Sequence, residues 1–183
     1  MNEAPLTAEQ IDVEDVYQAI ELYYERGWTD GLPVVPPTEK RVRAFLDAAG
    51  LGPDDVLGEI PERDRVLRAE LLAINAVMAG CRPEYMPVLV AATETVTDPA
   101  YKFNHMASLG SPWPVFVVNG PLARTLRFNS GLYLFGPTTR ANATCARAMS
   151  LLLWNCAEAR PDGIQRGQWG NPFRAVGFVA EDE

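Results

Sequence analysis

Glycine and proline residues divide this chain into short segments, and the apolar pattern of each segment predicts one element. Gly27, Gly50 and Gly80 each follow a run of helical spacing, where a glycine can close a helix. Pro83 suits the first position of a further helix. The predicted helices are 12–26, 38–49, 66–79, 83–98 and 139–158, and the predicted strands are 56–60, 114–118 and 174–180, with a strand or a turn at 132–135.

Four or five helices with three or four short strands in a small sheet make α+β the predicted fold class. The 183 residues are enough for one domain with a sizeable core, and two domains would be unusual at this length. We therefore expect a flexible N-terminal arm at 1–11, a single α+β domain at 12–180 and an acidic tail at 181–183.

Charge and composition exclude several classes of partner. The net charge of −8 disfavours nucleic acid, whose phosphates require a positive face. The longest apolar runs, 115–118 and 149–154, are far shorter than the roughly 20 residues that cross a bilayer. The N-terminus lacks the pattern of a signal peptide, and three widely spaced cysteines form no disulfide or zinc framework. We expect a cytoplasmic protein without a membrane or nucleic-acid partner and without a metal or other cofactor.

The junction around Cys81 is the best candidate for a functional site. If one helix ends at Gly80 and the next begins at Pro83, free N–H groups, the helix dipole and Arg82 would favour a thiolate at Cys81. Glu84 lies in the first turn, where its carboxylate could exchange protons with a substrate or cap the helix. A small buried cysteine at a tight helix corner is the alternative interpretation.

Two further segments place polar groups where a ligand could bind. The loop 27–38 is rich in glycine and proline, and Thr29 and Asp30 could contact a ligand or only close a turn. The start of the long helix carries hydroxyls, an arginine and an amide, a combination that suits a carboxylate or phosphate. Those residues are Thr138, Thr139, Arg140 and Asn142, which could equally form a helix cap and an ordinary ion pair.

Two single residues complete the set of candidates. His105 is the only histidine and could act as a general base, or as a metal ligand beside Cys81 and Glu84. Asn119 follows the buried strand and could donate a hydrogen bond to a substrate oxygen or cap a turn. The long helix from Thr139 is rich in alanine, so it is either the central core helix or packs against its copy in an oligomer.

Four stretches together resemble a known family. Residues 27–38, 75–85, 118–121 and 140–144 are similar to a poorly characterised bacterial family allied to the UGSC-motif (seleno)proteins, over roughly residues 12–160. In that family a selenocysteine or cysteine followed by Gly-Ser-Cys lies in a thioredoxin-like redox segment. This chain has no such motif, so the resemblance implies the companion domain alone, with the redox segment on a separate partner or absent.

These observations lead to two functional hypotheses. The first is an enzyme that acts on a small carboxylated or otherwise anionic molecule by lyase-like, hydrolytic or sulfur chemistry. Cys81 would be its reactive thiol, Glu84 or His105 its acid or base, and Arg140 its anion clamp. The second is a non-catalytic or accessory subunit of a redox or biosynthetic complex. Either hypothesis is compatible with a homo-oligomer, and the second predicts a hetero-oligomer.

Overall fold

The computed structural model describes residues 4–107, 112–136, 138–161, 163–165 and 177–181. Its α-helices are α1 (Val16–Glu25), α2 (Glu39–Ala49), α3 (Ala69–Met78), α4 (Met86–Thr97), α5 (Gly120–Thr125) and α6 (Arg140–Cys156). Its short 3-10 helices are η1 (Pro61–Arg63), η2 (Pro83–Tyr85), η3 (Pro99–Tyr101) and η4 (Phe103–Ala107). Its strands are β1 (Val56–Ile60), β2 (Arg65–Arg68), β3 (Val115–Val118) and β4 (Gly177–Ala180).

The α+β fold class is confirmed, with the strands arranged differently from the expectation. Among the described residues the four strands form two separate sheets, an antiparallel β1–β2 pair and a parallel β3–β4 pair. The helix predicted at 66–79 is wrong over its first three residues, which belong to β2. Leu67 is fully buried and pairs with Gly58 of β1, so cross-strand pairing decides a segment whose apolar spacing also fits a helix.

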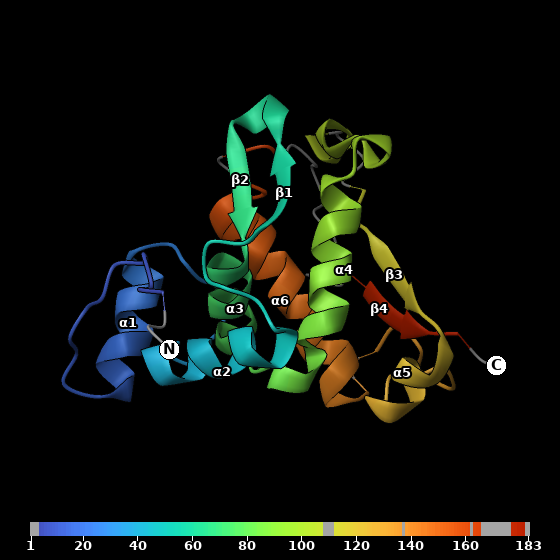
Figure 1. Cartoon of the computed structure of the whole chain (residues 1–183), viewed down its shortest axis with the longest axis horizontal. Coiled ribbons are helices and arrows are strands. Elements are labelled where there is room, and N and C mark those ends of the chain that lie inside the picture. The colour runs from blue at the N-terminus through green and yellow to red at the C-terminus, as the bar shows by residue number, and fades with distance from the viewer. Residues whose placement is uncertain (1–3, 108–111, 137, 162, 166–176, 182–183) are drawn as a thin grey trace.

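Helices α3, α4 and α6 form the centre of the molecule, and α2 crosses them at one end (Figure 1). Helix α3 has almost no polar face: eight of its ten residues are buried, so α6 and the other neighbours surround it. The alanine-rich side of α6 packs closely, and the run from Leu151 to Leu153 has no exposed surface. The long helix is therefore a core helix, as one of the two alternatives predicted.

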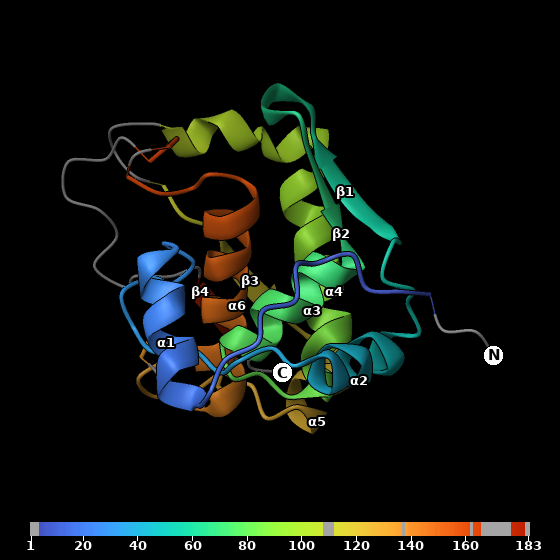
Figure 2. The ribbon, with the colours of Figure 1, turned by 90° about the vertical axis from the view of Figure 1, so that its left-hand side faces the viewer.

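The N-terminal segment crosses the outside of this core. Residues 4–11 form no helix or strand and run over α3 towards α1 (Figure 2). The carboxylate of Glu70, 1% exposed at the start of α3, accepts hydrogen bonds from the backbone N–H groups of Thr7 and Ala8 at 3.0 Å and from the Thr7 hydroxyl at 2.7 Å. One buried acid thus fixes the arm against the helix that it crosses.

Candidate functional site

The predicted corner at Cys81 exists, but its N–H groups are not free. Gly80 has a φ of 83°, and the backbone N–H of Cys81 donates to the Ala76 carbonyl at 3.0 Å, which closes α3 with a Schellman turn. The segment that follows is the short 3-10 helix η2, and α4 begins only at Met86. Cys81 therefore lies at the carbonyl end of α3, where the helix dipole does not favour a thiolate.

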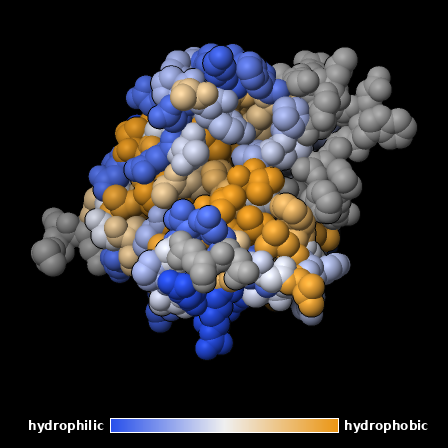
Figure 3. All heavy atoms as spheres, turned by 90° about the vertical axis from the view of Figure 1, so that its right-hand side faces the viewer, coloured by the Kyte–Doolittle hydropathy of each residue, from blue (hydrophilic) through white to orange (hydrophobic). Residues whose placement is uncertain are grey.

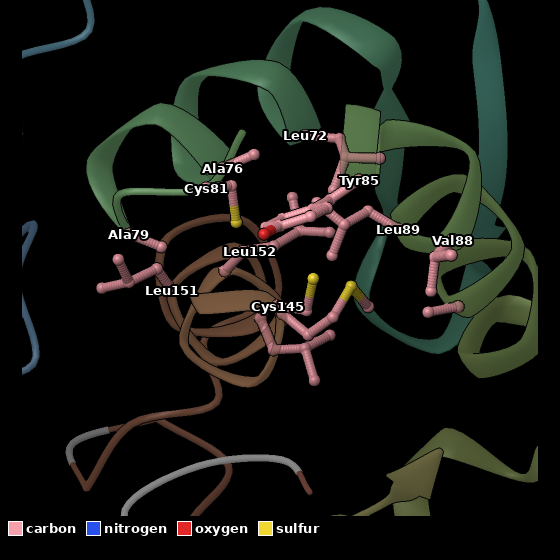
Figure 4. Close-up of a cluster of buried hydrophobic side chains, with 14 of the residues drawn as sticks. Leu72, Ala76, Ala79, Cys81, Tyr85, Val88, Leu89, Cys145, Leu151 and Leu152 are labelled. Carbon is pink, nitrogen blue, oxygen red and sulfur yellow. The ribbon is translucent and has the colours of Figure 1, made fainter. Parts of the chain in front are cut away.

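The thiol of Cys81 faces the core. Cys81 is 6% exposed, and its sulfur points into the same buried space as that of Cys145 on α6, with the Tyr85 hydroxyl beside it (Figure 4). The neighbouring Cys81 thiol raises the pKa of Cys145 far above its usual range, and burial adds to this effect. Burial likewise raises the pKa of the Tyr85 hydroxyl. These contacts favour the packing interpretation of Cys81, and no sequence spacing had indicated Cys145 as its neighbour.

Arg140 brings the start of α6 to this corner. Its Nε donates to the Gly80 carbonyl at 3.0 Å and its Nη2 to the Cys81 carbonyl at 3.3 Å. Cys81 and Arg140, which the first hypothesis placed in one site, are thus adjacent, but the guanidinium binds the carbonyls that end α3. The side chains of Arg82 and Glu84 are exposed on the surface next to it.

The other residues at the start of α6 build a structural network. Thr139 is the N-cap, and its hydroxyl accepts from the Asn142 N–H at 3.2 Å. The Asn142 side chain is buried: its Oδ1 accepts from the Asn129 N–H at 2.8 Å and its Nδ2 donates to the Phe178 carbonyl at 2.8 Å. Thr138 is exposed before the cap. Asn142 therefore fixes α6 to β4 and to the preceding loop.

Thr29 and Asp30 close a turn and anchor it to α6. The Thr29 hydroxyl donates to the Leu32 carbonyl. Arg147 donates from Nη2 and Nε to the two carboxylate oxygens of Asp30 at 2.8 and 3.1 Å, and also to the carbonyls of Leu32 and Pro33. Burial alone would raise the pKa of Asp30, but the hydrogen bonds and charge of Arg147 and the backbone donors hold it below its usual value. The expected ligand contacts are thus intramolecular ones.

His105 and Asn119 lie away from the Cys81 corner. His105 is exposed on η4, after the C-terminal end of α4, whereas Cys81 precedes the other end of that helix. Because α4 has 12 residues, it separates the two by about 18 Å. Asn119 is exposed before α5 and makes no side-chain capping bond there. The proposed grouping of Cys81, Glu84 and His105 is therefore not assembled in this structure.

A cavity of about 470 Å³ lies apart from the Cys81 corner, among elements whose ribbons face the viewer in Figure 2. The N-terminal arm, α1, the start of α2, α3 and the end of α6 form its walls. Trp28 and Pro36 come from the loop 27–38, and Ile74 and Met78 come from α3. Sequence patterns did not reveal this space, because its walls combine the stretch from the arm to the start of α2 with α3 and the end of α6, which lie far from that stretch along the chain.

Few polar groups line the inner wall of the cavity, and they are connected. The amide nitrogen of Asn155 donates to Asn75 Oδ1 at 2.8 Å and to the Trp28 carbonyl at 3.2 Å, while Asn155 Oδ1 is buried and has no partner among the described residues. Burial raises the pKa of the Cys156 thiol to about 12. At neutral pH the Cys156 thiol is therefore protonated, and the wall holds an acceptor that is buried without a donor among the described residues.

The burial of Cys81 and Cys145 predicts slow alkylation of these two thiols in the native protein. With iodoacetamide at mildly alkaline pH, we expect Cys81 and Cys145 to react on the order of 100-fold or more slowly than an accessible thiol, because reaction requires local opening. Peptide mass spectrometry measures the rate at each site, and protein unfolded in urea is the control in which all three react. Rapid and selective labelling of Cys81 in the native state would restore it as a nucleophile.

No group of three or more His, Cys, Asp or Glu side chains that could hold a metal ion occurs within the described ranges. None of the helices in the described part of the chain is long and apolar enough to cross a membrane. No protein-family model matches the chain, and no curated protein or solved structure matches it.

Proposed function

We propose that this protein binds a small molecule in the cavity beneath its N-terminal arm. The cavity itself is the observation that carries the proposal. Its volume of about 470 Å³ lies within the range of small-molecule sites, and aliphatic and aromatic side chains with a few polar groups line it. The sequence-based hypothesis of a small-molecule ligand is retained, at a place other than the Cys81 corner.

Thiol chemistry on a carboxylated substrate has less support. Cys81 packs in the core, and the Arg140 guanidinium binds two backbone carbonyls. Cys156 lines the cavity, but with a pKa raised to about 12 its thiol is a poor nucleophile at neutral pH. The cavity thus has a volume and hydrogen-bond acceptors that suit a small molecule. These features support non-covalent binding of that molecule.

A cavity-filling variant tests the site. The neutral dye N-phenyl-1-naphthylamine should bind the wild-type protein with a saturable rise in fluorescence. Ile74→Trp places a larger ring in the cavity and should weaken dye binding by about tenfold or more, since the dye and the indole compete for one volume. Val66→Trp, on an exposed part of β2, is the control and should leave dye binding unchanged. Equal binding by both variants would place the dye elsewhere.

An accessory role in a complex is a second candidate, supported by an exposed apolar face. Figure 3 shows hydrophobic residues gathered on the side that carries β3, β4 and α5. Leu132 is 95% exposed and Tyr133 74% exposed, an unusual position for large apolar side chains on a monomer surface. The other exposed hydrophobic residues of this region are Val115, Val117, Leu122 and Phe135.

The mass of the natively purified protein tests this candidate. Light scattering should give a mass well above 20.1 kDa for the wild type, from a second copy or from another subunit. Leu132→Asp should return the mass to 20.1 kDa, because a charge in an apolar interface loses its water without gaining a partner. Tyr17→Asp, at an exposed position on α1, is the matched control. A wild-type mass of 20.1 kDa at all concentrations would contradict the candidate.

A further inference from the structure

We infer that the cavity selects an organic ammonium ion with an apolar body. This inference rests on the proposed function and names the class of ligand. It differs from the anionic ligand expected from the sequence, because that expectation depended on Arg140, which does not line the cavity.

The charged residues that line the cavity are all acidic. Four carboxylate residues line it, and among the described lining residues there is no lysine, arginine or histidine. Glu70 is occupied by the arm, and Glu39 forms an ion pair with Arg43 at 2.8 Å. Glu9 and Asp12 are exposed at the rim. An anion entering this space would lose water without meeting a positive lining residue, whereas a cation would be attracted.

The inner wall offers a hydrogen-bond acceptor. The Asn155 amide nitrogen already donates to Asn75 Oδ1 and to the Trp28 carbonyl, so these two contacts fix the orientation of the amide. The remaining atom, Asn155 Oδ1, is buried without a donor among the described residues. A buried acceptor without a donor is costly, so a small rotation of the Asn155 amide that opens Oδ1 to the cavity would allow a ligand N–H group to satisfy it. Because an ammonium group only donates hydrogen bonds, it suits this acceptor.

Aromatic rings in the cavity wall are the third feature that favours an organic cation. Tyr23 and Trp28 both line the cavity and meet edge to face, with ring centroids 5.6 Å apart. The Arg26 guanidinium lies 5.4 Å from the centroid of Trp28, so the indole already interacts with a cation of the chain itself. Aromatic rings beside carboxylates attract organic cations, and the aliphatic wall from α3 would receive an apolar body.

Three matched probes test the ligand class by calorimetry at neutral pH and low salt. They are 3-phenylpropylamine, 3-phenylpropan-1-ol and 3-phenylpropanoate, which share one body and differ in their head group. We expect the amine to bind about tenfold more tightly than the alcohol, and the carboxylate to bind more weakly than either. Added salt should reduce the advantage of the amine, because the rim charges are exposed.

Variants separate this inference from the proposed function. The double variant Glu9→Gln/Asp12→Asn should bring the affinities of amine and alcohol close together, whereas Glu62→Gln/Glu94→Gln removes two exposed acids outside the cavity and should not. If the naphthylamine dye binds the cavity but the carboxylate equals or exceeds the amine, or no amine competes with the dye, the cation class is wrong and the site remains. If Ile74→Trp does not affect dye binding, the proposed function itself fails.

Discussion

Replacing Asn142 with alanine should lower the free energy of unfolding by about 3 kcal/mol, the largest effect that we expect from a single side chain at the start of α6. The Asn142 side chain is 4% exposed and accepts from the Asn129 N–H and the Thr139 hydroxyl, at 2.8 and 2.7 Å. It also donates to the Phe178 carbonyl at 2.8 Å. Alanine would remove the partners of the part-buried Asn129 N–H and the buried Phe178 carbonyl, and with them the hydrogen bond that fixes β4 to α6.

Urea denaturation followed by circular dichroism measures this loss, and Thr138→Ala is the control on the same helix start. Because Thr138 is exposed before the cap, its replacement should change the stability by no more than about 0.5 kcal/mol. A stable Asn142→Ala protein that had lost binding of a small anion would contradict the structural role and would restore Asn142 as a ligand contact.

The parts of the fold that depend only on residues close together in the sequence could be predicted from it. Gly50 in the left-handed conformation ends α2, and Thr139 caps α6, both from local chemistry. The strand β2 could not be predicted in this way. Leu67 continues the helical spacing of α3, and only its pairing with Gly58 of β1 shows that it belongs to a strand.

The candidate site was harder to predict, because its polar residues have distant partners. Glycines, threonines and an arginine at helix ends suggested ligand contacts, but the protein itself satisfies most of them. Arg147 binds Asp30 from 117 residues away, and Glu70 binds Thr7 from 63 residues away. Local patterns identify which residues need a hydrogen-bond partner. The partner itself is determined by tertiary packing, here of α6 against the loop 27–38 and of α3 against the N-terminal arm.

Asp30→Asn should destabilise the protein by about 2–3 kcal/mol near neutral pH. The side chains of Asp30 and Arg147 are 14% and 20% exposed, and their paired hydrogen bonds connect the turn after Trp28 to the middle of α6. Asparagine cannot supply two acceptor oxygens or a negative charge. Arg147 would then keep its two backbone carbonyl contacts but would lose its counter-charge in a half-buried position.

The pH dependence of this effect has a definite sign. The folded-state pKa of Asp30 lies below its ordinary value of 3.8, so the ion pair contributes its full stability above that value. The contribution is lost as the pH falls through the lower folded-state pKa. The difference in unfolding free energy between wild type and Asp30→Asn should therefore be constant at neutral pH and shrink in acid below about pH 4.

A matched variant shows whether burial is the cause. Asp54 lies 3.9 Å from Arg68, but the two side chains are 63% and 44% exposed, so water screens this pair. Asp54→Asn should cost no more than about 0.5 kcal/mol at any pH. Equal losses from Asp30→Asn and Asp54→Asn would mean that the Asp30–Arg147 pair does not anchor the loop. Since that loop supplies Trp28 to the cavity, a large loss at Asp30 alone would connect the stability of the fold to the shape of the proposed binding site.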